Sequence, residues 1–157
     1  MNVWSRYETK LWMSGLVGFA VRWIFRLTWR RIEFIPPGEK LWRALHKVDQ
    51  VYREPRRAGR PKPSFFRDKW GLSCDLARFS TAERSRIGHA EKPHPAEAGL
   101  VEFSVGNVRE IGSDVRHEPV RKPRRNYAHA QFTSTPSTPA RSKLADKSTY
   151  HVPQRFV

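Results

Sequence analysis

Two histidines in an arginine-rich segment are the side chains best suited to catalysis. His117 and His129 lie near the ends of residues 116–129, which read RHEPVRKPRRNYAH. Histidine titrates near neutral pH, so one ring can take the proton from a 2′-hydroxyl while another protonates the leaving oxygen. Arginines would stabilise the negative charge of the phosphorane. One candidate function is therefore a small metal-independent ribonuclease of the toxin or defence type, with His117 and His129 as its catalytic residues.

The same segment can bind RNA without cutting it. Arginines neutralise phosphates and release counterions, and the rings of Tyr127 and Phe132 offer faces on which unpaired bases stack. Binding needs a less strict geometry than catalysis. We therefore favour a nucleic-acid-associated protein over an enzyme, and RNA over DNA as its ligand. Residues 54–63, EPRRAGRPKP, form a second basic segment. The predicted nucleic-acid-binding residues are Arg56, Arg57, Arg60, Lys62, Arg121, Lys122, Arg124, Arg125 and Tyr127.

The motifs of several other kinds of site are missing. The sequence contains no GxxxxGK(S/T), GxGxxG, GxSxG, HExxH or CxxC pattern, which disfavours nucleotide triphosphate hydrolysis, zinc peptidase and disulfide exchange activities. His89 and His94 have no convincing third ligand, so we predict no metal site and no cofactor. Cys74, the single cysteine, alternates with Leu72 and Leu76, which indicates a buried small hydrophobe rather than a nucleophile.

Positive charge is concentrated at the two ends of the chain. The 157 residues include 30 Lys plus Arg and 15 Asp plus Glu, a net charge of +15. Residues 1–63 hold 14 basic and 5 acidic side chains, a net of +9, while residues 64–120 hold 8 and 9, a net of −1. Residues 121–157 hold 8 basic and 1 acidic, a net of +7. A neutral module with two basic flanks predicts a polyanionic partner.

The N-terminal segment combines apolar and basic residues. Residues 11–21, LWMSGLVGFAV, are uncharged, but a transmembrane helix needs about 20 apolar residues, and a longer run would bury Arg22 and Arg26. We therefore expect no transmembrane span, and instead an amphipathic basic helix within residues 1–35. This helix would dock on the protein's own core, on a larger protein or ribonucleoprotein assembly, or peripherally on a membrane. The predicted docking residues are Trp12, Phe19, Arg22, Trp23, Arg26 and Trp29.

Targeting explanations for this segment remain open. A signal peptide would need small residues at a cleavage site, where this chain has the bulky residues 22–24. An organellar presequence agrees better with an arginine-rich, acid-poor helix, and translation could also start at Met13. We expect a cytoplasmic location, with peripheral membrane contact or organellar targeting as alternatives.

The middle of the chain shows the clearest periodic patterns. Leu41 and Leu45 belong to an apolar stripe with helical spacing, which predicts a helix over residues 39–53 before the basic linker. Ser80 and Glu83 match a capping box at the start of a short helix. Residues 100–117 predict a strand at 100–104, a helix at 105–111 that ends at a left-handed Gly112, and a second strand from residue 114.

These patterns predict a small single α+β domain. Seventeen residues are few for a parallel crossover, so the short sheet could be mixed or antiparallel, and a mixed sheet is the fold prediction. The domain would carry the N-terminal basic helix and a largely irregular C-terminal arm rich in Ser, Thr and Pro. The predicted divisions are the N-terminal helix at 1–35, a helix and linker at 36–63, the α+β core at 64–120 and the basic arm at 121–157.

Overall fold

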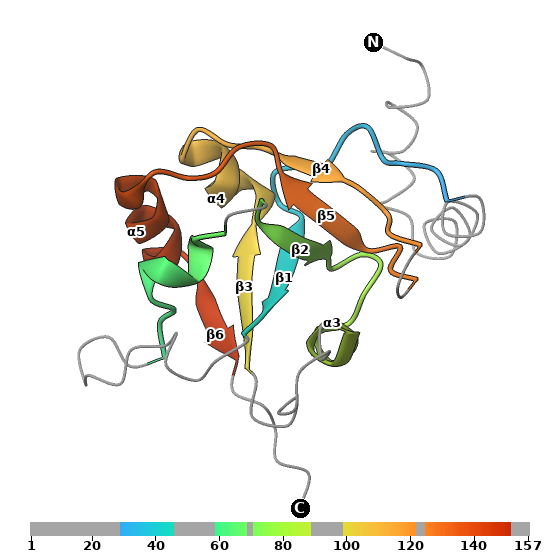
Figure 1. Cartoon of the computed structure of the whole chain (residues 1–157), viewed down its shortest axis with the longest axis horizontal. Coiled ribbons are helices and arrows are strands. Elements are labelled where there is room, and N and C mark those ends of the chain that lie inside the picture. The colour runs from blue at the N-terminus through green and yellow to red at the C-terminus, as the bar shows by residue number, and fades with distance from the viewer. Residues whose placement is uncertain (1–28, 46–58, 69–70, 89–98, 122–124, 152–157) are drawn as a thin grey trace, which may run out of the picture.

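The computed structural model of the chain describes residues 29–45, 59–68, 71–88, 99–121 and 125–151. Its six strands form one sheet in the order β4-β5-β2-β1-β3-β6 (Figure 1). All neighbouring strands are antiparallel, so the domain is α+β as predicted but its sheet is not mixed. The strands are β1 (Lys40–Ala44), β2 (Ser73–Leu76), β3 (Leu100–Ser104), β4 (Val115–His117), β5 (His129–Phe132) and β6 (Thr149–His151). The helices are the 3-10 helix η2 (Pro63–Phe66) and the α-helices α3 (Ala82–Gly88), α4 (Val105–Glu110) and α5 (Thr138–Asp146).

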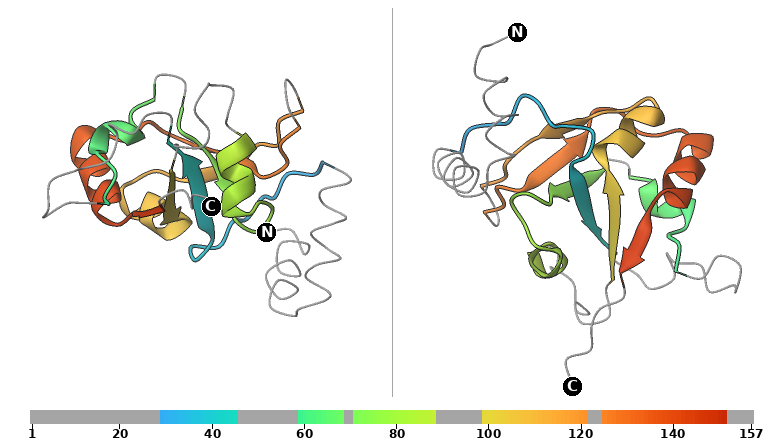
Figure 2. Two further views of the ribbon diagram at one scale, coloured as in Figure 1. Left: turned by 90° about the horizontal axis from the view of Figure 1, so that it is seen from below. Right: turned by 180° about the vertical axis from the view of Figure 1, so that it is seen from behind.

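The register of the strands gives the sheet one strongly apolar face. Residues paired across strands point to the same side, and Leu41 of β1 is paired with both Leu76 and Phe103. Helix η2 covers this face, because Phe66 meets Phe103 edge to face with ring centres 5.6 Å apart. Helix α5 packs beside η2 and adds Leu144 to the core. Figure 2 shows α5 and η2 together at one end of the molecule, far from α3.

Residues 40–44 correct the helix predicted over 39–53. They form β1, which pairs with β2 on one side and β3 on the other, in the interior of the sheet. The spacing of four between Leu41 and Leu45 fits a helix, but it is also two periods of a strand, and both residues are buried. Residues 40–44 form a strand and no helix because β2 and β3, both distant in sequence, pair with its two edges. Residues 46–53 lie outside the described part of the chain.

The C-terminal region also departs from the prediction of a largely irregular arm. Its described residues contain β5, α5 and β6, and Ala130, Phe132, Leu144 and Ala145 belong to the core. Helix α5 has its own start signal, since the Ser137 side chain caps it and a proline follows in its first turn. The two strands are only four and three residues long. Strand β5 pairs with β2 as well as with nearby β4, and β6 pairs with β3, so both strands depend on partners distant in sequence and their own sequences carried little signal.

The predicted elements between residues 100 and 117 are confirmed. Strand β3, helix α4 and strand β4 follow in the expected order, and Gly112 has a left-handed φ of 80° just beyond α4. The capping box lies at Ser104 and Asn107, which start α4. At α3 the predicted Ser80–Glu83 box is replaced by a single side-chain cap one residue later, in which the Thr81 hydroxyl accepts from the backbone N–H of Arg84 at 3.2 Å.

A buried ion pair joins the start of β1 to the turn after β2. Glu39 accepts from the Arg78 backbone N–H at 3.0 Å and from its Nε at 2.7 Å. The two side chains are only 10% and 5% exposed. Two charges so far from water are stable only while each has its partner. This contact therefore holds residues 77–79 against the sheet.

We expect Glu39→Gln to lower the free energy of unfolding by about 3 kcal/mol, because it leaves a buried guanidinium without its countercharge. Chemical denaturation measures this loss. Lys40→Gln is the matched control, since Lys40 pairs with Glu102 but is 61% exposed, and its loss should stay below about 1 kcal/mol. Equal losses in both variants would contradict the structural role of the Glu39 pair.

Candidate nucleic-acid interface

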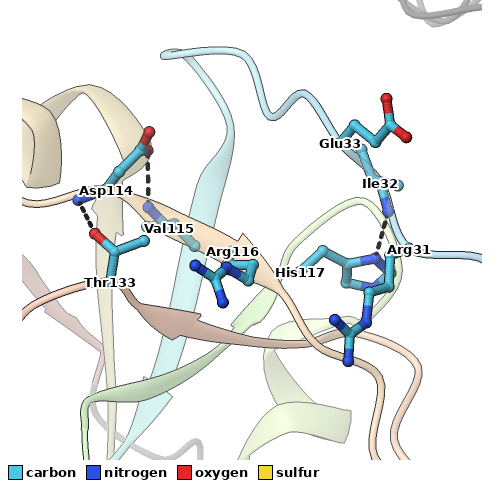
Figure 3. A pocket seen from close by; sticks show the side chains of 8 residues that line it. All are labelled: Arg31, Ile32, Glu33, Asp114, Val115, Arg116, His117 and Thr133. Carbon is cyan, nitrogen blue, oxygen red and sulfur yellow. Dashed lines mark hydrogen bonds between the residues drawn. The ribbon is translucent and has the colours of Figure 1, made fainter.

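His117 is a buried part of the core of the domain. Its ring, on edge strand β4, has 0% exposure and stacks on Phe79 with ring centres 5.6 Å apart. Nδ1 accepts from the Ile32 backbone N–H at 3.0 Å (Figure 3), and Nε2 lies 2.6 Å from the Tyr127 carbonyl oxygen. A backbone N–H can only donate and a carbonyl can only accept, so the geometry assigns the neutral ring with its proton on Nε2.

The electrostatics around His117 favour the same neutral form. Burial lowers the pKa of His117 to about 4, and the positive charges of Arg78 and Arg31 act in the same direction. The hydrogen bond to the Tyr127 carbonyl opposes this shift. With both nitrogens occupied by backbone groups, His117 has no free position from which to exchange a proton with a substrate.

His129 projects from the opposite side of the β4–β5 pair. His117 is paired with Ala130, so the residue before Ala130 in β5 points to the other face. His129 is half-buried, and its Nδ1 lies 2.7 Å from the Glu118 carbonyl oxygen. The structure therefore does not bring the two predicted catalytic rings together on one surface.

Five exposed arginines gather at the β4 edge of the sheet, and we call this group the basic corner. The segment that begins at Trp29 runs along β4 (Figure 1). The Tyr127 hydroxyl fastens it by donating to the Arg30 carbonyl at 2.5 Å. An isolated bridge between Val120 and Asn126 places Arg121 and Arg125 side by side. The basic corner consists of Arg30, Arg31, Arg116, Arg121 and Arg125.

Most of this positive charge is not neutralised by neighbouring carboxylates. Within the described part of the chain, no carboxylate lies within ion-pair distance of Arg30, Arg31, Arg121 or Arg125, and Arg116 meets Glu118 only at 3.6 Å. By contrast, the guanidinium of Arg109, at the end of α4, lies 2.9 Å from a carboxylate. The basic corner is therefore open to a negatively charged ligand.

A surface cavity of about 370 Å³ opens between the N-terminal segment and β4. The guanidinium groups of Arg31 and Arg116 approach it from these two different segments (Figure 3). The acidic residues in its lining are Glu33 and Asp114, and Asp114 is already paired with Arg109. The other lining residues are Ile32, Val115, His117 and Thr133.

The two aromatic residues of this region that were predicted to contact nucleic acid are buried. Tyr127, a predicted nucleic-acid contact, is only 5% exposed, and Phe132, a predicted stacking residue, is 6% exposed. Trp29, predicted to dock on a membrane or partner, meets Tyr127 edge to face with ring centres 5.8 Å apart. The guanidinium of Arg121 lies over the Trp29 ring, 5.2 Å from its centre. Trp29 is thus a partly exposed ring that lies beside the arginines of the basic corner.

The second predicted basic segment lies elsewhere. Arg60 is at the α5 end of the molecule, 3.6 Å from Asp146, and Lys62 immediately precedes η2. The two predicted basic segments therefore do not form one surface in the described residues (Figure 1). The predicted binding residues outside the described part are Arg56, Arg57, Lys122 and Arg124, and the predicted docking residues outside it are Trp12, Phe19, Arg22, Trp23 and Arg26.

Arg30, Arg31 and Arg116 were not among the predicted binding residues. The adjacent pair Arg30 and Arg31 at the end of the basic N-terminal segment is a sequence signal for a binding site. Because the pair is far along the chain from residues 116–129, the sequence did not show that the two segments lie together.

Cys74 is buried, as predicted, and burial raises its pKa.

Comparison with known proteins adds no functional information. No family model, curated protein or solved structure matches the chain. Among the described residues, no helix is long and apolar enough to cross a membrane. The same residues contain no group of three or more His, Cys, Asp or Glu placed to hold a metal ion. Function must therefore be inferred from the chain's own side chains.

We expect acid to weaken the fold through His117. Its pKa of about 4 lies below the ordinary value of 6.5, so on acidification the unfolded chain takes up a proton before the folded chain does. The stability from burying the neutral ring is complete above pH 6.5 and is lost as the pH falls towards 4, by roughly 3 kcal/mol. Denaturation at several pH values measures it.

The control for this titration is His117→Gln. A glutamine amide can accept from Ile32 and donate to Tyr127 but does not titrate, so the variant should lose less stability between pH 7 and pH 4.5. Identical pH profiles for the two proteins would contradict the assignment of a buried, neutral His117.

Proposed function

We propose that the chain binds RNA through the basic corner. The observation that supports this most directly is the convergence of five exposed arginines from segments far apart in sequence, four of them without a carboxylate partner in the described residues. Like charges repel, so a fold that gathers them without countercharges leaves a surface that a polyanion stabilises. Guanidinium groups suit phosphates because they donate paired hydrogen bonds in one plane.

The distribution of charge supports this surface over the other end of the domain. Near α5 and η2, Arg60 faces Asp146, and Lys147 forms a close ion pair with Glu110. A ligand that bound there would have to compete with these carboxylates. In the basic corner, phosphates would meet exposed guanidinium groups directly, as nucleic-acid-binding surfaces require.

Binding without cleavage agrees better with the geometry than catalysis by the predicted histidines does. A metal-independent ribonuclease needs an acid and a base that reach the same phosphodiester. His117 is buried with both nitrogens engaged, and His129 projects from the opposite face. We therefore propose RNA binding alone, with the arginines as its contacts.

The test replaces Arg30, Arg31, Arg121 and Arg125 together by Gln. Fluorescence anisotropy with a labelled single-stranded RNA, repeated over a range of salt concentrations, measures affinity and its salt dependence. Each lost phosphate contact should reduce the slope of log affinity against log salt by about 0.7. We expect weaker binding and a slope up to about 3 smaller than that of the unchanged protein.

The matched control removes the same charge from other surfaces. Arg60, Arg67, Arg84 and Lys143 are all exposed and lie outside the basic corner, so their joint replacement by Gln should leave the slope nearly unchanged. Equal losses in both quadruple variants would show a diffuse charge effect instead of a defined surface. Absence of salt-sensitive RNA binding by the unchanged protein would overturn the proposed function.

A further inference from the structure

Arg121 of the basic corner is placed against an aromatic ring, that of Trp29. Attraction to phosphates alone would not require this placement. The guanidinium of Arg121 lies over the indole ring of Trp29, 5.2 Å from the ring centre. Arg121 is exposed, whereas Trp29 is half-buried beneath it. A planar cation over an aromatic face is attracted by the ring's quadrupole, and Arg is well suited to this because its group is flat.

The Trp29 ring is held in place from below. It meets the ring of Tyr127 edge to face at an interplanar angle of 87°. Tyr127 is itself buried and donates its hydroxyl hydrogen to the Arg30 carbonyl. Trp29 also has a φ of 53°, a left-handed backbone conformation that is unfavourable for a bulky residue and persists only where surrounding contacts stabilise it. The ring under Arg121 is therefore fixed in position.

We propose that Arg121, supported by Trp29, is a stacking platform for one unpaired base. This inference rests on the proposed function and narrows its ligand to single-stranded RNA. A guanidinium plane has two faces, and bases of unpaired nucleotides stack on arginine planes as well as on aromatic rings. In the proposed complex, one face of the Arg121 guanidinium is turned towards Trp29, over which it lies, and the base stacks on the other face. Arg30, in the same segment as Trp29, meets the adjoining phosphates.

The two rings predicted to stack bases, Tyr127 and Phe132, are enclosed by the protein, and so is the ring of His117. Tyr127 is 5% exposed, Phe132 is 6% exposed and His117 is 0% exposed. A base cannot reach these faces without opening the core. In a duplex, each base is already stacked on its neighbours, so the platform favours unpaired nucleotides.

The experiment separates stacking from charge by keeping the charge constant. Arg121→Lys retains the positive charge but has no plane, and Arg84→Lys is the matched control at an exposed arginine outside the basic corner. Each protein is titrated with a single-stranded RNA and with an abasic strand of the same length, which has the same phosphates and no bases. Thermal unfolding checks that both variants are folded.

We expect the unchanged protein and Arg84→Lys to prefer the base-containing strand by roughly fivefold or more, which is the size of one stacking contact. Arg121→Lys should lose most of this preference while it binds the abasic strand as before. Equal, salt-sensitive binding of both strands by the unchanged protein would overturn the stacking platform but leave the proposed function standing. No binding of either strand would overturn both.

Discussion

One buried imidazole joins the two parts of the chain that form the basic corner. The Nδ1 atom of His117 accepts a hydrogen bond from the backbone N–H of Ile32, and Nε2 donates one to the carbonyl oxygen of Tyr127. Strand β4 is at the edge of the sheet, and no strand of the described residues pairs with its outer side. The hydrogen bond from the Ile32 backbone to the His117 side chain holds the N-terminal segment beside β4, so that Arg31 and Arg116 line the same cavity. Together with the hydrogen bond from the Tyr127 hydroxyl to the Arg30 carbonyl, this bond positions the N-terminal arginines relative to the β4–β5 pair.

The charge state of this imidazole is matched to its surroundings. A protonated ring would have to donate from both nitrogens, and Nδ1 would then face another donor, the N–H of Ile32. It would also add a positive charge near Arg31 and Arg78, both of which lower its pKa. A neutral His117 adds no buried positive charge next to the arginines of the basic corner. The positive charges of the basic corner therefore lie at the surface, where water and ligands reach them.

Local patterns predicted the part of the fold in which neighbours along the chain determine the structure. Residues 100–117 contain a strand, a capped helix and a glycine stop, and each of these features depends on residues only a few positions apart. Strand β1 was predicted as a helix because a spacing of four residues suits both structures. The C-terminal elements were predicted as irregular because β5 and β6 are short and gain stability from distant strands. The prediction failed where pairing across the sheet outweighs local preference.

The sequence by itself determined that the chain is strongly basic, that this charge lies towards its two ends, and that the fold is α+β. It also predicted Arg121 and Arg125 as binding residues, because they belong to a dense local run. Only the tertiary structure decided that His117 belongs to the core and that Trp29 and Arg30 lie beside that run. The physical reason is that burial and ring contacts depend on residues brought together across the sheet, whereas charge and helix capping can be counted along the chain.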